Sequence, residues 1–167
     1  MKKNEHIANY LYDQSIVSIK YFTLISRNKK ILQLNKNQNE IIDSNQIIEL
    51  KKSLSLILKA FYLQENKEKN QLEILKIIQK QTLNYQKIVD GVQHRFNKKQ
   101  LNHINSILSI FNVEMALFSY QNRDLINFIF DKSNVKKNNN LLSKSDLLVI
   151  SLQNTYKKNY LISYNAA

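Results

Sequence analysis

One glycine and no proline among 167 residues limit what this chain can fold into. Tight turns between strands depend on residues with a positive or fixed φ, chiefly Gly and Pro. A sandwich, barrel or propeller of many strands would lack those turns. Phosphate-binding loops need clustered glycines, and Gly91 stands alone. The sequence therefore predicts an all-α protein whose turns use Asn, which tolerates the left-handed backbone conformation.

The length and composition indicate one packed domain. A chain of 167 residues with 43% hydrophobic residues has the size of one domain and enough apolar material for a core. We expect a single helical domain over 1–167, built as a bundle of four or five helices. The sequence contains no Cys, which excludes disulfides, zinc fingers and a thiol nucleophile.

Apolar residues at spacings of three and four predict the helices of the first half. A first stripe falls within 5–27, and polar residues rich in Asn then predict a linker over 28–43. A second stripe follows a capping-box spacing formed by Asp43 and Gln46. The first stripe comprises Ile7, Leu11, Val17, Tyr21 and Leu24, and the second comprises Ile47, Leu50, Leu54, Ile57 and Phe61.

A long antiparallel hairpin of the coiled-coil kind is predicted over about 68–131. The second stripe fades near 65–69, and its heptad phase resumes at Leu75. Two helices, or one long helix over 44–97, both fit this pattern. A polar turn at 97–99 then reverses the chain into the second arm of the hairpin.

The C-terminal part divides into a helix, a loop and a further helix. Apolar spacing predicts a helix over 100–131, and the Lys- and Asn-rich segment 131–144 predicts a mobile loop. A last helix is expected over 145–164, where Val149, Leu152, Tyr156 and Tyr160 form its stripe.

The apolar surface exceeds one stripe per helix. A second stripe lies beside the first in the segment 74–88, and the segment 125–130 is apolar almost all round. A small bundle gives each helix about one buried face, so we expect the excess to contact a protein partner or another copy of the chain. The candidate interface residues are Ile74, Ile77, Ile88, Phe128 and Phe130.

The formal charge of +12 has two explanations. It could mark a partner with many phosphates. Arg27, Arg95 and Arg123 are the only arginines, however, and the abundance of Lys, Asn and Ile is typical of an AT-rich genome. The candidate phosphate contacts lie on one helical face or in predicted turns: Lys69, Lys76, Lys80, Lys87, Lys98, Lys99, Lys136 and Lys137.

No residue pattern predicts catalysis. Asp90 and His94 share a helix face at a spacing of four and could form an acid–base pair. An arginine with a polar neighbour and a nearby histidine would suggest an all-α ribonuclease, but Phe96 follows Arg95. Carboxylates and histidines are not grouped at metal-ligand spacings. We therefore expect no enzyme activity, no cofactor and no metal.

Two functions remain open from the sequence. The leading hypothesis is a non-enzymatic interaction or assembly subunit that acts through apolar helix faces. The alternative is a sequence-independent nucleic-acid-binding subunit of a ribonucleoprotein or defence-type complex, which would use the lysines. No run of residues is long and apolar enough for a membrane span, and the expected location is the cytoplasm.

Overall fold

The computed structural model describes residues 2–31, 36–66, 73, 85–116 and 145–161. This part of the chain contains five α-helices and no strand, which confirms the all-α prediction. The helices are α1 (Lys2–Ile31), α2 (Lys36–Glu65), α4 (Tyr85–Val92), α5 (Lys98–Ala116) and α8 (Ser145–Tyr156). Two short elements accompany them, the 3₁₀-helix η1 (Gln93–Arg95) and the π-helix η2 (Lys157–Leu161).

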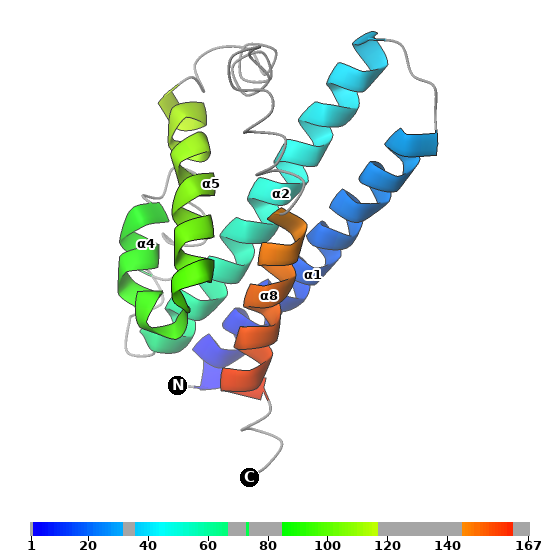
Figure 1. Ribbon diagram of the computed structural model, residues 1–167. Helices are drawn as coiled ribbons and strands as arrows, with labels where there is room; N and C mark the ends of the chain where they lie inside the picture. The colour runs from blue at the N-terminus through cyan, green and yellow to red at the C-terminus, as the bar shows by residue number, and fades with distance from the viewer. Residues whose placement is uncertain (1, 32–35, 67–72, 74–84, 117–144, 162–167) are drawn as a thin grey trace.

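The helices pack as a bundle around α2. The long helices α1 and α2 run antiparallel, and α8 lies against both of them (Figure 1). The short helix α4 also packs on α2, and α5 packs on α8. The C-terminal half of α2 is therefore surrounded by neighbouring helices.

The core lies along the C-terminal half of α2 because apolar residues face almost every side of it from Leu54 to Leu63, with the buried Ser55 and Lys59 as polar exceptions. The side chains of Leu54, Ile57, Leu58, Phe61 and Leu63 are each at most 1% exposed. A helix that is apolar all round has no face to give to water and is stable only when it is covered. The predicted stripe of α2 is confirmed at Leu50, Leu54, Ile57 and Phe61, which are all buried.

The first helix buries only part of its predicted stripe: Leu11 is buried and Ile7 is half-buried. Val17, Tyr21 and Leu24 of the predicted stripe are 44%, 56% and 52% exposed. The buried face instead contains small side chains, which allow α1 to lie close to its neighbours. The buried residues of α1 are Ala8, Leu11, Tyr12, Ser15, Ser18, Ile19 and Phe22.

The predicted linker 28–43 is wrong over most of its length. Residues 28–31 belong to α1 and residues 36–43 to α2, while 32–35 lie outside the described residues. Asp43 is therefore inside α2, and no helix begins there. Instead, the Gln46 amide donates a hydrogen bond to the Ser26 hydroxyl at 2.5 Å and joins the two helices. Pairing between helices outweighs the weak helix propensity of Asn in this region.

The second helix ends at Glu65, so it is separate from α4. The backbone N–H of Asn66 donates to the carbonyl of Tyr62 at 3.0 Å, and the Asn66 side-chain amide donates to the same carbonyl at 2.9 Å. One continuous helix over 44–97, the second of the two predicted alternatives, is therefore wrong. Of the predicted hairpin, the segments 68–72, 74–84 and 117–131 lie outside the described residues, as does the predicted loop 131–144.

Lys98 and Lys99 of the predicted turn 97–99 belong to α5, and this helix begins with a capping box that was not predicted. The N–H of Gln100 donates to the Asn97 side-chain carbonyl at 2.8 Å, and the N–H of Asn97 donates to the Gln100 side-chain carbonyl at 3.0 Å. Two otherwise unpaired donors at the start of α5 are thereby satisfied. The helix begins at Lys98, two residues before the predicted boundary.

Candidate functional site

Among the described residues, a cluster of charged and polar side chains surrounds Glu65 at the end of α2. The Nε of Arg95 donates to Glu65 Oε1 at 2.7 Å, and the hydroxyl of Tyr160 donates to the same oxygen. His94 Nε2 lies 3.3 Å from Glu65 Oε2. The Arg95 guanidinium also lies over the Tyr160 ring, 5.9 Å from its centroid. This cluster joins three elements: α2, η1 and η2.

The electrostatics of this cluster are those of a satisfied ion pair. Burial alone would raise the pKa of Glu65, but hydrogen bonds from Tyr160, Arg95 and His94 together lower it below its ordinary value. The hydrogen bond to Glu65 raises the pKa of Arg95. Burial, followed by the bond to Glu65, raises the pKa of Tyr160. A carboxylate with partners on both oxygens is held in its charged form, which suits a structural link better than a general base.

This pairing differs from the one predicted from the sequence. The spacing suggested Asp90 as the partner of His94, whereas the structure places Glu65 there, 29 residues away along the chain. Residues four apart on a helix are neighbours, but His94 lies in the 3₁₀-helix that follows α4 and leaves that face. Spacing in the sequence carries no signal for a contact between the ends of different helices.

A second polar cluster is mostly buried and ties α1, α2 and α8 together. The Gln64 amide donates to the Tyr156 hydroxyl at 2.9 Å, and that hydroxyl donates to the Asn9 side-chain carbonyl at 2.7 Å. The Gln153 amide donates to the Ser15 hydroxyl at 3.1 Å. Buried polar groups that satisfy one another stabilise a particular packing and offer little to a ligand.

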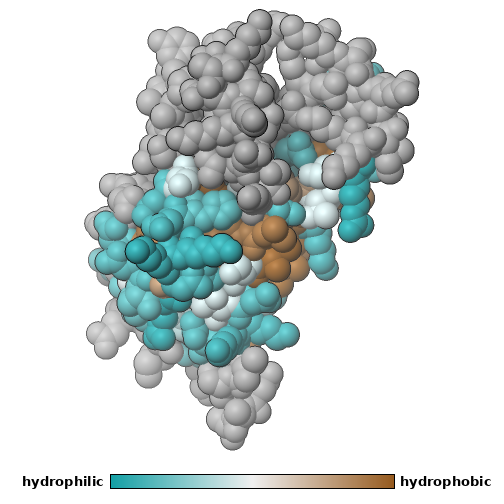
Figure 2. All heavy atoms as spheres, in the orientation of Figure 1, coloured by the Kyte–Doolittle hydropathy of each residue, from teal (hydrophilic) through white to brown (hydrophobic). Residues whose placement is uncertain are grey.

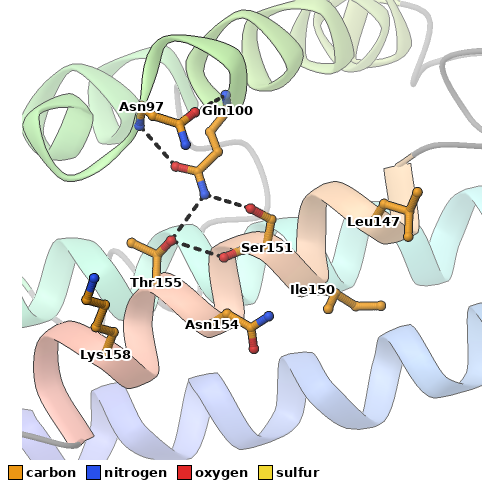
Figure 3. Close-up of a pocket in the computed structure, with 8 residues that line it drawn as sticks. All are labelled: Asn97, Gln100, Leu147, Ile150, Ser151, Asn154, Thr155 and Lys158. Atoms are coloured by element: carbon orange, nitrogen blue, oxygen red, sulfur yellow. Dashed lines mark hydrogen bonds between the residues drawn. The ribbon is translucent and has the colours of Figure 1, made fainter.

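A groove of about 410 Å³ lies between the start of α5 and the outer face of α8 (Figure 3). The Gln100 amide on its wall donates to the hydroxyls of Ser151 and Thr155 at 2.8 and 3.1 Å. These donors and acceptors are already paired across the groove and hold α5 on α8. Its lining residues are Asn97, Gln100, Leu147, Ile150, Ser151, Asn154, Thr155 and Lys158.

Few of the predicted lysines can be placed. Lys98 and Lys99 are exposed in the first turn of α5, and Lys87 lies in α4. The other candidates, Lys69, Lys76, Lys80, Lys136 and Lys137, lie outside the described residues. The two placed side chains at one helix end make no extended basic surface by themselves.

Of the five predicted interface residues, only Ile88 lies within the described part of the chain. Ile88 is 2% exposed and belongs to the core, so its side chain has no surface to offer a partner, and its assignment to an interface is wrong. It is covered because α4 packs its apolar face directly onto α2. Ile74, Ile77, Phe128 and Phe130 lie outside the described residues.

Exposed apolar side chains instead gather on α1. Tyr10, Val17, Tyr21 and Leu24 are 60%, 44%, 56% and 52% exposed. Their spacings of seven, four and three place them along one line of the helix. We call these four residues the α1 outer row. The row lies opposite the face that α1 gives to the core.

A smaller apolar area lies on α8. Leu147 and Ile150 are 63% and 40% exposed. Figure 2 shows brown, hydrophobic surface in this region of the molecule, beside a largely hydrophilic area. Two side chains of this kind are common on the surface of a folded protein. A line of four along one helix is a stronger indication of a binding surface.

Metal-ligand groups and membrane-spanning helices are both absent from the described residues. Among them, no group of three or more His, Cys, Asp or Glu side chains could hold a metal ion. None of the helices in this part of the chain combines the length and apolar character needed to cross a bilayer. No protein-family model matches the chain, and neither a curated protein nor a solved structure shows significant similarity to it.

Proposed function

We propose that this protein is a non-enzymatic interaction or assembly subunit whose binding surface is the α1 outer row. The observation that carries the proposal is the exposure of four large apolar side chains along one line of α1, each between 44% and 60%. Contact with a partner would remove this apolar area from water. Aromatic side chains such as Tyr10 and Tyr21 are also among those that contribute most to binding energy.

The spacing of the row supports a helix as the binding element. Tyr10, Val17, Tyr21 and Leu24 occupy successive core positions of a heptad repeat, with only the position of Gln14 between them filled by a polar residue. Such a line fits the groove between the side chains of another helix. A flat or irregular partner surface would match it less well.

The proposal is tested by substitution within the row and at a matched site. The native complex is isolated from the host with tagged chains that carry Val17→Glu or, as the control, Ile150→Glu. Both side chains are similarly exposed, at 44% and 40%, so either substitution leaves the core intact. We expect Val17→Glu to reduce the complex to the 19.8 kDa monomer and Ile150→Glu to leave its size unchanged.

The same experiment distinguishes the proposed function from the nucleic-acid hypothesis. Binding through lysines would be lost steeply with added salt or after nuclease digestion, and Val17→Glu would leave it intact. A complex that survives Val17→Glu, or a wild-type chain that never enters a complex, would contradict the proposed function.

A further inference from the structure

We infer that the α1 outer row binds the same row of a second copy of this chain, with the two α1 helices antiparallel. This inference rests on the proposed function and specifies its partner. It is carried by two independent features of α1: the self-complementary order of its exposed apolar residues, and the positions of the exposed charges beside them.

The apolar line of α1 is longer than the row itself. Ile7 is half-buried and occupies the core position of the heptad that precedes Tyr10. Together with Gln14, this gives six successive core positions, 7, 10, 14, 17, 21 and 24, at alternating spacings of three and four. Five of these six side chains are apolar, so nearly three heptads of α1 can pair with a helix.

Reversing this line onto itself aligns large side chains with one another. We assign heptad position a to Ile7, Gln14 and Tyr21, and position d to Tyr10, Val17 and Leu24. In an antiparallel pair, each a position lies beside a d position of the other helix. One register places Ile7 beside Leu24 of the second copy, Tyr10 beside its Tyr21, and Gln14 beside its Val17. The two-fold axis repeats each pairing, as a closed dimer requires. All six core positions then have a partner.

The charges beside the row are complementary in the same register. Asp13 and Lys20 occupy g positions on one flank, and both side chains are exposed. In an antiparallel pair, g positions face each other across the interface, and this register sets Asp13 beside Lys20 of the second copy. Because of the two-fold axis, the ion pair forms twice.

Other alignments lose this complementarity. A shift by one heptad pairs only four of the six core positions and places Lys20 beside Lys20 of the second copy, where like charges repel each other, although Asp13 then lies near the exposed Arg27. In a parallel pair, g positions face e positions, and Asp13 would lie near Ser18, which is buried in its own bundle at 2% exposure. The antiparallel arrangement also brings the positive end of each helix dipole near the negative end of the other.

The first test uses charge exchange. We expect light scattering on the wild-type chain to give about twice the 19.8 kDa monomer mass at micromolar concentration. Asp13→Lys replaces two attractions by two repulsions and should weaken the dimer by about tenfold at low salt. Lys20→Asp should do the same. The double variant Asp13→Lys, Lys20→Asp restores both ion pairs and should recover wild-type affinity.

The second test reports the direction of the helices. The natural chain has no Cys, so single introduced cysteines give unambiguous disulfides. A mixture of the Tyr10→Cys and Tyr21→Cys chains should form a mixed disulfide dimer under oxidation. Either variant alone should remain largely reduced. Rapid disulfide formation by Tyr10→Cys alone would indicate parallel helices and overturn the inference.

The outcomes distinguish this inference from the proposed function. A wild-type chain that is monomeric at all concentrations, yet loses a different native partner on Val17→Glu, overturns the dimer and leaves the row as a binding surface. A dimer that is unaffected by Val17→Glu overturns the inference. If the native complex also survives that substitution, the proposed function fails as well. Circular dichroism on each variant verifies that the helices are intact.

Discussion

At the scale of single residues, the size and position of a side chain determine whether it is buried more than its hydrophobicity does. Ser15 and Ser18 are fully buried while Tyr21 and Leu24 are exposed on the same helix. The Ser15 hydroxyl donates to the carbonyl of Tyr12 at 2.6 Å, which satisfies its hydrogen-bonding need inside the bundle. A small hydroxyl residue can therefore replace an apolar one wherever two helices approach closely.

Gly91 is a second position at which side-chain size determines how closely two helices can pack. A Cβ at this position would lie 3.1 Å from Cε2 of the Tyr62 ring, because α4 crosses α2 closely here. We expect Gly91→Ala to be nearly neutral, since a gain in helix propensity of about 1 kcal/mol offsets a small displacement of the ring. Gly91→Val crowds the ring further and should lower the free energy of unfolding by about 1–3 kcal/mol.

Chemical denaturation measures both variants, and Tyr62→Ala supplies the control. In the Tyr62→Ala background the ring is absent, so Gly91→Val should cost markedly less than in the wild-type chain. If Gly91→Val lowered the free energy of unfolding equally in the two backgrounds, the glycine would not be needed for the approach of α4 to α2.

At the scale of elements, the ends of the helices are held by side chains from elsewhere in the chain. Glu65 at the end of α2 binds Arg95 of η1 and Tyr160 of η2. Gln100 completes the capping box of α5 and also donates to Ser151 on α8. Each contact fixes the position of one helix relative to another, which a short connection alone would not do.

The carboxylate of Glu65 makes the stability of these contacts dependent on pH. Its pKa in the folded protein lies below its ordinary value, so its contribution is complete above the unfolded pKa of about 4.3 and is lost as the pH falls through the folded pKa. Glu65→Gln should lower the free energy of unfolding by about 1 kcal/mol at neutral pH. The difference from wild type should shrink below about pH 4.

Urea denaturation of both proteins at a series of pH values tests this dependence. The two curves of unfolding free energy against pH should converge toward acid. A difference that stays constant from neutral to acid pH would mean that the charge of Glu65 contributes nothing and that only its shape matters.

At the scale of the whole molecule, a cluster of aromatic rings connects the helices. Tyr12 of α1 stacks on Tyr156 of α8 with centroids 4.8 Å apart. Phe61 of α2 forms T-shaped pairs with Phe96, Tyr156 and Tyr160, with centroids 4.9, 5.3 and 5.8 Å apart. These geometries are the favourable ones for aromatic pairs. The cluster makes the folding of α1, α2 and α8 mutually dependent.

The tyrosines of this cluster predict cooperative unfolding in alkali. Burial raises the pKa of Tyr12, Tyr156 and Tyr160. The folded protein therefore keeps their protons, while the unfolded chain releases them near pH 10, so stability is complete below about pH 10 and is lost above it. Tyrosinate absorbance and circular dichroism, recorded together, should show these three tyrosines ionising in the same step in which the helices are lost. Ionisation of all nine tyrosines of the chain while the helices remain intact would contradict this.

The sequence alone determined the fold class and the main buried surfaces. One glycine and no proline exclude turn-rich folds, and helical spacing predicts the stripe of α2 that is buried at Leu50, Leu54, Ile57 and Phe61. Val149, Leu152 and Tyr156 were likewise predicted as the stripe of the last helix and are all buried in α8. These properties follow from local composition and spacing, which are visible in any segment taken by itself.

Only the tertiary structure decided which face of α1 lies inside and which groups meet at Glu65. Both faces of α1 have apolar residues at helical spacing, and the choice depends on how closely its small residues approach α2 and α8. Glu65, Arg95 and Tyr160 are separated by 30 residues or more, and no local pattern connects them. The α1 outer row is exposed because the core can cover only one side of a surface helix, and its opposite side is left to water or to a partner.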